Sequence, residues 1–214
     1  MKAVVVAHGD VHPDDRSQLA GADLIVAADG GARALDEWGV LPNLVVGDLD
    51  SLDRDRATQY GWKGVKISKF PREKDESDLE LALQAALEGG AEEIVLLGLF
   101  GGKRLDYTLA NALLLADTSY AGVSLRAVHG DTTLRALHGG GRLEILCDVG
   151  DLVTLLPVHG DAEGVSTEGL RYALRSGTLR FGRARGVSNV VTSSPASVAL
   201  ERGTLLVIES RADR

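Results

Sequence analysis

Residues 24–39 read LIVAADGGARALDEWG, in which an apolar run passes through Asp-Gly-Gly into a helix pattern. The run at 24–28 is apolar at every position, as expected for a strand that is covered on both faces of a parallel sheet. Residues 30–38 predict a helix, and Gly39 ends it. A strand followed at once by a helix is the repeating unit of an α/β fold.

The same alternation continues to residue 138. Helices are predicted at 79–87, with Ser77 or Asp78 as the N-cap, and at 105–116. Further strands are predicted at residues 3–7, 44–47, 65–67, 94–97 and 123–128. This order favours a mostly parallel sheet with flanking helices, of the Rossmann-like α/β class.

Residues 139–214 lack this alternation. Short strands are predicted there at residues 142–146, 152–156, 178–181, 197–200 and 204–208. The composition changes at the sequence HGGG of residues 138–141, since all the lysines precede it. We therefore expect an α/β domain over 1–138 and a small all-β sandwich or barrel over 139–214. A part of about 75 residues is hard to stabilise alone, so we expect it to pack on the α/β part or on a second subunit.

Composition excludes several classes of protein. The net charge is −8, and residues 1–138 carry all of it with 22 acidic and 14 basic residues. No stripe of Lys and Arg interleaved with aromatic residues appears, which disfavours nucleic-acid binding. No apolar run approaches the roughly 18 residues of a membrane span. The single Cys147 allows no internal disulfide and no Cys/His zinc site, and it indicates a reducing, cytoplasmic compartment.

Acidic residues and glycines follow three of the predicted strands. Asp29 follows the strand at 24–28, Asp48 and Asp50 follow the strand at 44–47, and a glycine-rich loop follows the strand at 94–97. Ligands of open parallel sheets bind at the carboxyl ends of the strands, so these groups are expected to meet at one edge. Asp48 and Asp50 lie two residues apart, and an extended backbone would direct both side chains the same way. Mg²⁺ is the natural partner of such carboxylates, and it leaves coordination sites for phosphate oxygens.

Each pattern also has an ordinary structural explanation. Asp-x-Asp after a strand is common in turns, and Gly101-Gly102 is by itself a turn signal. Residues 74–78 would serve equally as a solvated N-cap, and residues 186–189 as a β-turn. Lys103 and Arg104 have no such structural explanation, because positive side chains next to the N-terminus of a helix are repelled by the positive end of its dipole. A bound anion would offset this repulsion.

An ordered series of motifs along the chain resembles the thiamine pyrophosphokinase family, whose members make thiamine diphosphate from thiamine and ATP. The resemblance covers nearly the whole chain. The matching segments are DGGA at 29–32, PNLVVGDLDS at 42–51, KDESDLE at 74–80, GGKRLDYTLAN at 101–111, STEGLRY at 166–172 and Ser188-Asn189.

Three positions depart from the family pattern. Lys103 is an extra residue after Gly-Gly, so Lys103 and Arg104 are both candidates for the phosphate contact, and the spacing to Asp106 favours Arg104. Tyr107 replaces a common histidine, and Ser77 replaces a threonine with its hydroxyl group retained.

The resemblance implies a pyrophosphoryl transfer from ATP to the hydroxyl group of thiamine, by homodimers that bind thiamine between the α/β domain of one subunit and the β domain of the other. It implies that Asp48, Asp50 and Asp75 hold Mg²⁺. Asp48, Asp50 and Arg104 are the implied catalytic residues, and Asp48 or Asp50 is the candidate for accepting the hydroxyl proton. Thiamine is expected at Ser188 and Asn189. The residues expected at ATP are Asp29, Gly30, Asp75, Ser77, Asp78, Gly101, Gly102, Arg104 and Asp106.

Three other functions fit part of the pattern. A diphosphokinase for another hydroxymethyl heterocycle, such as a pterin, would share the α/β domain, but the β domain with Ser188-Asn189 favours thiamine. An Asp-x-Asp phosphatase of the haloacid dehalogenase type needs Thr or Val at the fifth position, where this chain has Leu52. A nucleotide-binding module without activity is disfavoured because every acidic motif residue is retained.

Overall fold

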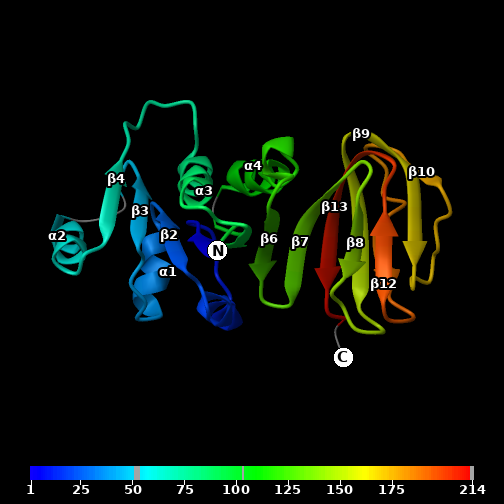
Figure 1. Cartoon of the computed structure of the whole chain (residues 1–214), viewed down its shortest axis with the longest axis horizontal. Coiled ribbons are helices and arrows are strands. Elements are labelled where there is room, and N and C mark those ends of the chain that lie inside the picture. Colours follow the sequence, from blue (N-terminus) through cyan, green and yellow to red (C-terminus); the bar gives the residue numbers. More distant parts are fainter. Residues whose placement is uncertain (51–53, 103, 213–214) are drawn as a thin grey trace. The chain divides into compact units, whose positions relative to one another are not determined.

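The computed structural model describes residues 1–50, 54–102 and 104–212, and the chain forms two compact units (Figure 1). The first unit comprises Met1–Asn111 and Gly122–Gly130, and the second comprises Ala112–Ala121 and Asp131–Arg214. β7 (Thr132–His138) belongs to the second unit, because it pairs antiparallel with β13 (Arg202–Ser210). The change of composition at 138–141 therefore falls after the first strand of the second unit.

The first unit is built on a parallel sheet, as the consecutive apolar runs predict. Each pair of hydrogen-bonded strands in this sheet is parallel. The pairs are β1 with β2 and β5, β2 with β3, β3 with β4, and β5 with β6. The strand order is β4 (Lys66–Lys69), β3 (Leu44–Gly47), β2 (Leu24–Ala28), β1 (Lys2–Val6), β5 (Glu93–Leu97) and β6 (Ser124–His129). The chain adds strands on one side of β1 and then returns to its other side with β5. The loops after β1 and β5 therefore flank the point where open α/β sheets bind their ligands.

Four α-helices occur in the described part: α1 (Gly31–Glu37), α2 (Arg54–Trp62), α3 (Asp78–Glu88) and α4 (Leu105–Leu114). Short 3₁₀ segments cover Pro13–Leu19 and Thr118–Tyr120. The predictions of α1, α3 and α4 are confirmed, whereas α2 was not predicted. Among the described residues, no helix combines the length and the apolar character that crossing a membrane requires.

The core of the first unit follows from the apolar strands. Val4, Val5 and Val6 on β1 are all fully buried, so both faces of this strand are covered. α3 buries Leu79, Ala82, Leu83 and Ala86, which lie on one face at helical spacing. In contrast, α4 has no buried residue, and Leu105, Leu109 and Leu113 are exposed. These leucines of α4 therefore do not enter the core, whereas Leu115 and Ala116, which directly follow the helix, are buried.

The described residues of the second unit after Gly130 form strands and no α-helix. Its strands are β7, β8 (Arg142–Ile145), β9 (Leu152–Glu168), β10 (Gly177–Leu179), β11 (Asn189–Val190), β12 (Ala196–Ala199) and β13. The long β9 pairs with β13 over its first half and with β12 near its end. One buried cluster collects apolar side chains from these strands, among them Val153, Leu179 and Val198.

Candidate active site

Three carboxylates meet at the carboxyl edge of the parallel sheet. Asp29 follows β2, and Asp48 and Asp50 follow β3, its neighbour in the sheet. One ligand oxygen from each of them lies within 4.8 Å of the others. Asp29 is almost buried, Asp48 is half-buried and Asp50 is exposed. The sheet topology thus brings together residues that are about twenty positions apart in the sequence.

The backbone at Asp29 fixes its carboxylate at this edge. Asp29 adopts a positive φ of 41°, and its N–H donates to the carbonyl oxygen of Val46 at 2.7 Å. The next two residues must be glycines, because neighbouring atoms lie too close to leave room for a Cβ atom. A Cβ atom on Gly31 would lie 1.9 Å from the carbonyl oxygen of Val6, and one on Gly30 would lie 2.4 Å from the ring of His8. The Asp-Gly-Gly sequence therefore sets Asp29 close to the end of β1.

Asp48 and Asp50 converge by a route that differs from the expected extended backbone. Leu49 between them has a positive φ of 64°, and the N–H of Asp50 donates to Oδ1 of Asp48 at 3.1 Å. This side-chain hydrogen bond closes a tight turn of the Asx type. The turn, rather than the two-residue period of a strand, brings the carboxylates together. Ser51, at the end of the same motif, lies outside the described residues.

The three carboxylates fit a divalent cation. They offer hard oxygen ligands from three side chains, which is the donor set that Mg²⁺ prefers. Carboxylates this close repel one another unless a cation or a proton offsets their charge. Asp29 is the most buried of the three, so its charge has lost the most solvent on folding.

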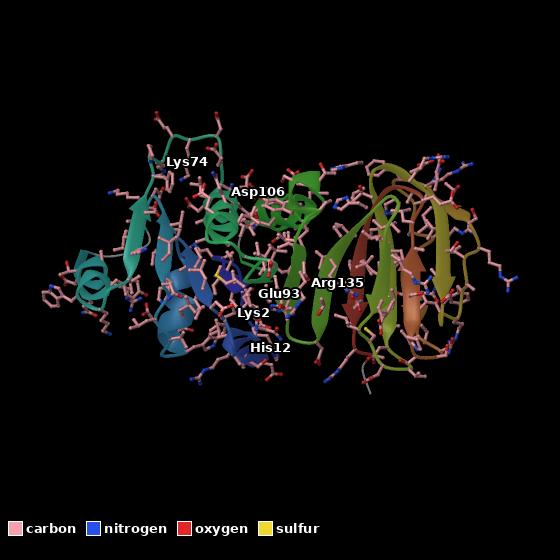
Figure 2. All side chains as sticks on the ribbon, viewed as in Figure 1. Lys2, His12, Lys74, Glu93, Asp106 and Arg135 are labelled. Carbon is pink, nitrogen blue, oxygen red and sulfur yellow. The ribbon has the colours of Figure 1, made fainter. Side chains whose placement is uncertain are left out.

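Asp78 lies against Gly47, on which Asp29 also packs, whereas Asp75 does not join the three carboxylates. The Cγ atom of Asp78 is 3.2 Å from the position of a Cβ on Gly47, and its Oδ1 accepts from Nζ of Lys74 at 2.8 Å. Asp75 is exposed on the loop between β4 and α3, where Figure 2 labels Lys74. The structure therefore places Asp29, and not Asp75, with Asp48 and Asp50.

Ser77 is the N-cap of α3. Its Oγ accepts from the N–H of Glu80 at 3.2 Å, and Oε2 of Glu80 accepts from the N–H of Ser77 at 2.8 Å. This reciprocal capping box confirms the N-cap prediction and explains part of the motif at 74–80 structurally.

The glycine-rich loop leads to an exposed ion pair. Gly101 and Gly102 have positive φ angles of 78° and 74°. Arg104 holds Asp106 through two of its nitrogens, and the Arg104 guanidinium lies 4.7 Å from the centre of the Tyr107 ring. The hydrogen bond to Asp106 raises the pKa of Arg104, and the hydrogen bond from Arg104 lowers the pKa of Asp106. Both side chains stay charged at neutral pH, and the exposed guanidinium of Arg104 is open to an anionic ligand. Lys103 lies outside the described residues.

Ser188 and Asn189 lie at the start of β11, and their environments differ. Ser188 is exposed, has a φ of 57°, and donates its N–H to Oγ1 of Thr154 at 3.0 Å. Asn189 is buried, and its side-chain amide is hydrogen-bonded to the backbone of Tyr172. Tyr172 itself is exposed. The exposed side chains of Ser188 and Tyr172 are therefore available to a ligand.

Two residues at the same edge were not singled out from the sequence. Nδ1 of His8 lies 3.9 Å from Oδ2 of Asp29, and Oδ2 of Asp10 accepts from the N–H of Gly102 at 3.1 Å. Both belong to the loop that follows β1. The rule that placed Asp29 and Asp48 would have found them too, because β1 ends at the same edge.

These features define a class: an α/β protein whose sheet carries three carboxylates at one edge, next to a glycine-rich loop, and whose chain continues into an all-β unit. The family model for the thiamin pyrophosphokinase catalytic domain matches residues 16–126, and the model for the vitamin B1 binding domain of the same enzymes matches residues 143–205. The chain belongs to the thiamin pyrophosphokinase family.

Individual relatives are similar to this chain over almost their full length. The thiamine pyrophosphokinase of Bacillus subtilis (strain 168) is 26% identical over 214 residues, covering 98% of this chain and 99% of the relative. The thiamin pyrophosphokinase structure from Geobacillus thermodenitrificans is 28% identical, with a TM-score of 0.85 over 100% of this chain and 99% of the other. The structure of the Bacillus subtilis enzyme superposes with a TM-score of 0.87 over all of both chains at 23% identity, which supports the fold.

Proposed function

We propose that this chain transfers the pyrophosphoryl group of ATP to the hydroxyl group of thiamine, giving thiamine diphosphate and AMP. The observation that carries the proposal is the match of both family models, in order, to a chain whose Asp29, Asp48 and Asp50 converge at one sheet edge. Transfers of this kind depend on positioning and on neutralisation of phosphate charge rather than on a protein nucleophile. The carboxylates, through a bound Mg²⁺, and Arg104 would supply both the positioning and the positive charge.

The carboxylates would hold Mg²⁺, with Asp29, Asp48 and Asp50 as the ligands, and Asp78 would lie near Asp29 at Gly47. When bound, the ion supplies positive charge that offsets the charge of the phosphate oxygens. Asp50 is the most exposed of the three, and we propose that it or Asp48 accepts the proton of the thiamine hydroxyl group.

The glycine-rich loop and Arg104 would receive the phosphates of ATP. Positive φ angles at Gly101 and Gly102 form a tight turn without side chains, and backbone N–H groups in such turns suit anions. Arg104 is exposed and charged, and its planar guanidinium suits phosphate. Asp106 orients this guanidinium through its hydrogen bonds. Asp75, Ser77 and Asp78 are proposed to border the nucleotide.

We propose that thiamine binds to the second unit near Ser188, with Asn189 holding the backbone there, and that residues 139–214 form the thiamine-binding β-sandwich. We further propose that the chain forms homodimers whose sites are shared between the two subunits. We also propose a cytoplasmic location, which the single, free Cys147 supports.

A product assay tests the activity. The protein is incubated with ATP, thiamine and Mg²⁺, and nucleotides and thiamine esters are separated by chromatography. Equal amounts of AMP and thiamine diphosphate, with no product in EDTA, are expected. ADP with thiamine monophosphate would contradict the pyrophosphoryl transfer, and activity on a pterin alcohol alone would contradict the choice of thiamine.

Mixed dimers test the shared site. Asp50→Asn and Ser188→Arg each remove one side of the site, so neither homodimer is expected to work. Random mixing would place half of the chains in heterodimers with one intact site, restoring about a quarter of wild-type activity. Mixtures that stay inactive would overturn the proposal that two subunits share each site. A wild-type protein that sediments as a monomer would overturn it as well.

A further inference from the structure

The loop that follows β1 joins the two halves of the candidate site. It contains His8, Gly9 and Asp10, and β1 lies between β2 and β5 in the sheet. On one side the ring of His8 lies against Gly30, next to Asp29. On the other side Asp10 contacts Gly101 and the N–H of Gly102. This short segment therefore touches both the carboxylates and the glycine-rich loop.

Backbone hydrogen bonds continue the pairing of β1 and β5 beyond the ends of these strands. The N–H of Gly9 donates to the carbonyl oxygen of Gly98 at 2.8 Å, and the N–H of Asp10 donates to that of Phe100 at 2.7 Å. A Cβ atom on Gly9 would lie 2.3 Å from the same Phe100 oxygen, so only glycine fits there. The two loops are thus held together as closely as neighbouring strands.

The carboxylate of Asp10 then fixes the turn itself. Its Oδ2 accepts from the N–H of Gly102 at 3.1 Å and lies 2.2 Å from the position that a Cβ on Gly101 would occupy. Asp10 fills the space left by the missing side chain of Gly101. Both glycines have positive φ angles, and such residues lose much conformational entropy on ordering. A hydrogen bond from outside the turn offsets part of that loss.

We propose that Asp10 is a positioning residue: it holds the Gly101–Gly102 turn in the geometry that receives the phosphates of the nucleotide, and so couples this turn to the end of β1. The proposal rests on the proposed function, because the turn has a phosphate to receive only if the chain binds ATP. In this role Asp10 acts through its hydrogen-bond acceptor and through its shape. Asparagine keeps the acceptor and the shape, whereas alanine loses both.

Two variants and a control test the proposal: Asp10→Ala, Asp10→Asn, and Asp14→Asn at an exposed aspartate on the neighbouring 3₁₀ segment. Amide exchange of Gly102, measured by NMR without ligand, should accelerate about tenfold in Asp10→Ala, as expected for the loss of a hydrogen bond worth about 1.4 kcal/mol. Exchange in Asp10→Asn and Asp14→Asn should stay near the wild-type rate. Unchanged exchange in Asp10→Ala would overturn the anchoring role, whatever reaction the chain catalyses.

Steady-state kinetics then test the link to the nucleotide. In Asp10→Ala the KM for ATP should rise about tenfold with the KM for thiamine unchanged, and Asp10→Asn should restore most of the wild-type value. A lower KM for ATP in either variant would show that the carboxylate competes with phosphate and would overturn the proposal, as would an Asn variant as impaired as the Ala variant. If the wild-type protein forms no product from ATP and thiamine, the proposed function is refuted. The exchange measurement would still decide the role of Asp10 in the turn.

Discussion

The side-chain amide of Asn189 closes a two-point hydrogen-bond pair with the backbone of Tyr172. Its Oδ1 accepts from the N–H of Tyr172 at 2.9 Å, and its Nδ2 donates to the carbonyl oxygen of Tyr172, also at 2.9 Å. The resemblance to the thiamine pyrophosphokinase family implies that Asn189 binds thiamine. In the structure its donor and its acceptor are both used to hold the segment that carries the exposed Tyr172 ring.

We therefore expect Asn189→Ala to lower stability as well as thiamine affinity. The substitution leaves the N–H and the carbonyl group of Tyr172 without these partners, which should reduce the free energy of unfolding by about 1–3 kcal/mol. Urea denaturation measures this change, with Ser188→Ala as the exposed neighbouring control. An Asn189→Ala protein of wild-type stability that has lost only thiamine binding would show that the amide meets the ligand directly.

Charge-neutral variants of the carboxylates test the cation site. Asp29→Asn and Asp50→Asn each remove a ligand and a negative charge, so both should weaken Mn²⁺ binding, measured by electron paramagnetic resonance, at least tenfold and lower turnover about a hundredfold or more. Glu144→Gln, at an exposed carboxylate on β8, serves as the control. If Mn²⁺ binds Asp50→Asn as tightly as the wild type, the cation is held elsewhere.

Substitutions at Lys103 and Arg104 decide which cation meets phosphate. Arg104→Lys keeps the charge but loses the planar contact with Asp106, so the KM for ATP should rise about tenfold without a change in melting temperature. Lys103→Ala should have a smaller effect on the same KM. The reverse ranking would assign the phosphate contact to Lys103.

The thiol of Cys147 is expected to react slowly. Burial, followed by the nearby charges of Glu209, Asp151 and Asp148, raises its pKa to about 11. Because only the thiolate is nucleophilic, alkylation by iodoacetamide in the native protein should be slow at pH 8 and should rise with pH toward 11. Unfolding in urea should restore the reactivity of an ordinary cysteine. Rapid alkylation of the native protein at pH 8 would contradict the described environment.

The helices and strands of the first unit were predictable where a local sequence signal, such as a helix cap, and the pattern of apolar residues indicate the same element. Ser77 and Glu80 mark the start of α3 through side chains that bond to the adjacent backbone, and this signal needs no tertiary structure. α2 was not predicted, because RDRATQYGW has few apolar residues; in the structure Tyr60 is buried in the core cluster and Ala57 packs against it. β9 was expected to stop near Leu156, yet it continues to Glu168 through positive φ angles at His159, Gly160 and Gly164.

The candidate site was predictable only where strand ends determine it. Asp29 and Asp48 follow neighbouring strands, so the topology alone brings them together. Asp75 and Asn189 were assigned by resemblance, and their surroundings depend on contacts that a linear motif does not contain. Asp75 lies on an exposed loop, and the amide of Asn189 is used by a backbone segment 17 residues away.

Pyrophosphoryl transfer from ATP to thiamine is tested most directly with ATP that carries a radioactive label on its β-phosphorus. The protein, Mg²⁺ and thiamine are added, and the products are separated. The label is expected in thiamine diphosphate, in equal amount to unlabelled AMP, because the β- and γ-phosphates move together. A label that stays in the nucleotide as ADP would show transfer of the γ-phosphate alone and would contradict the proposed reaction.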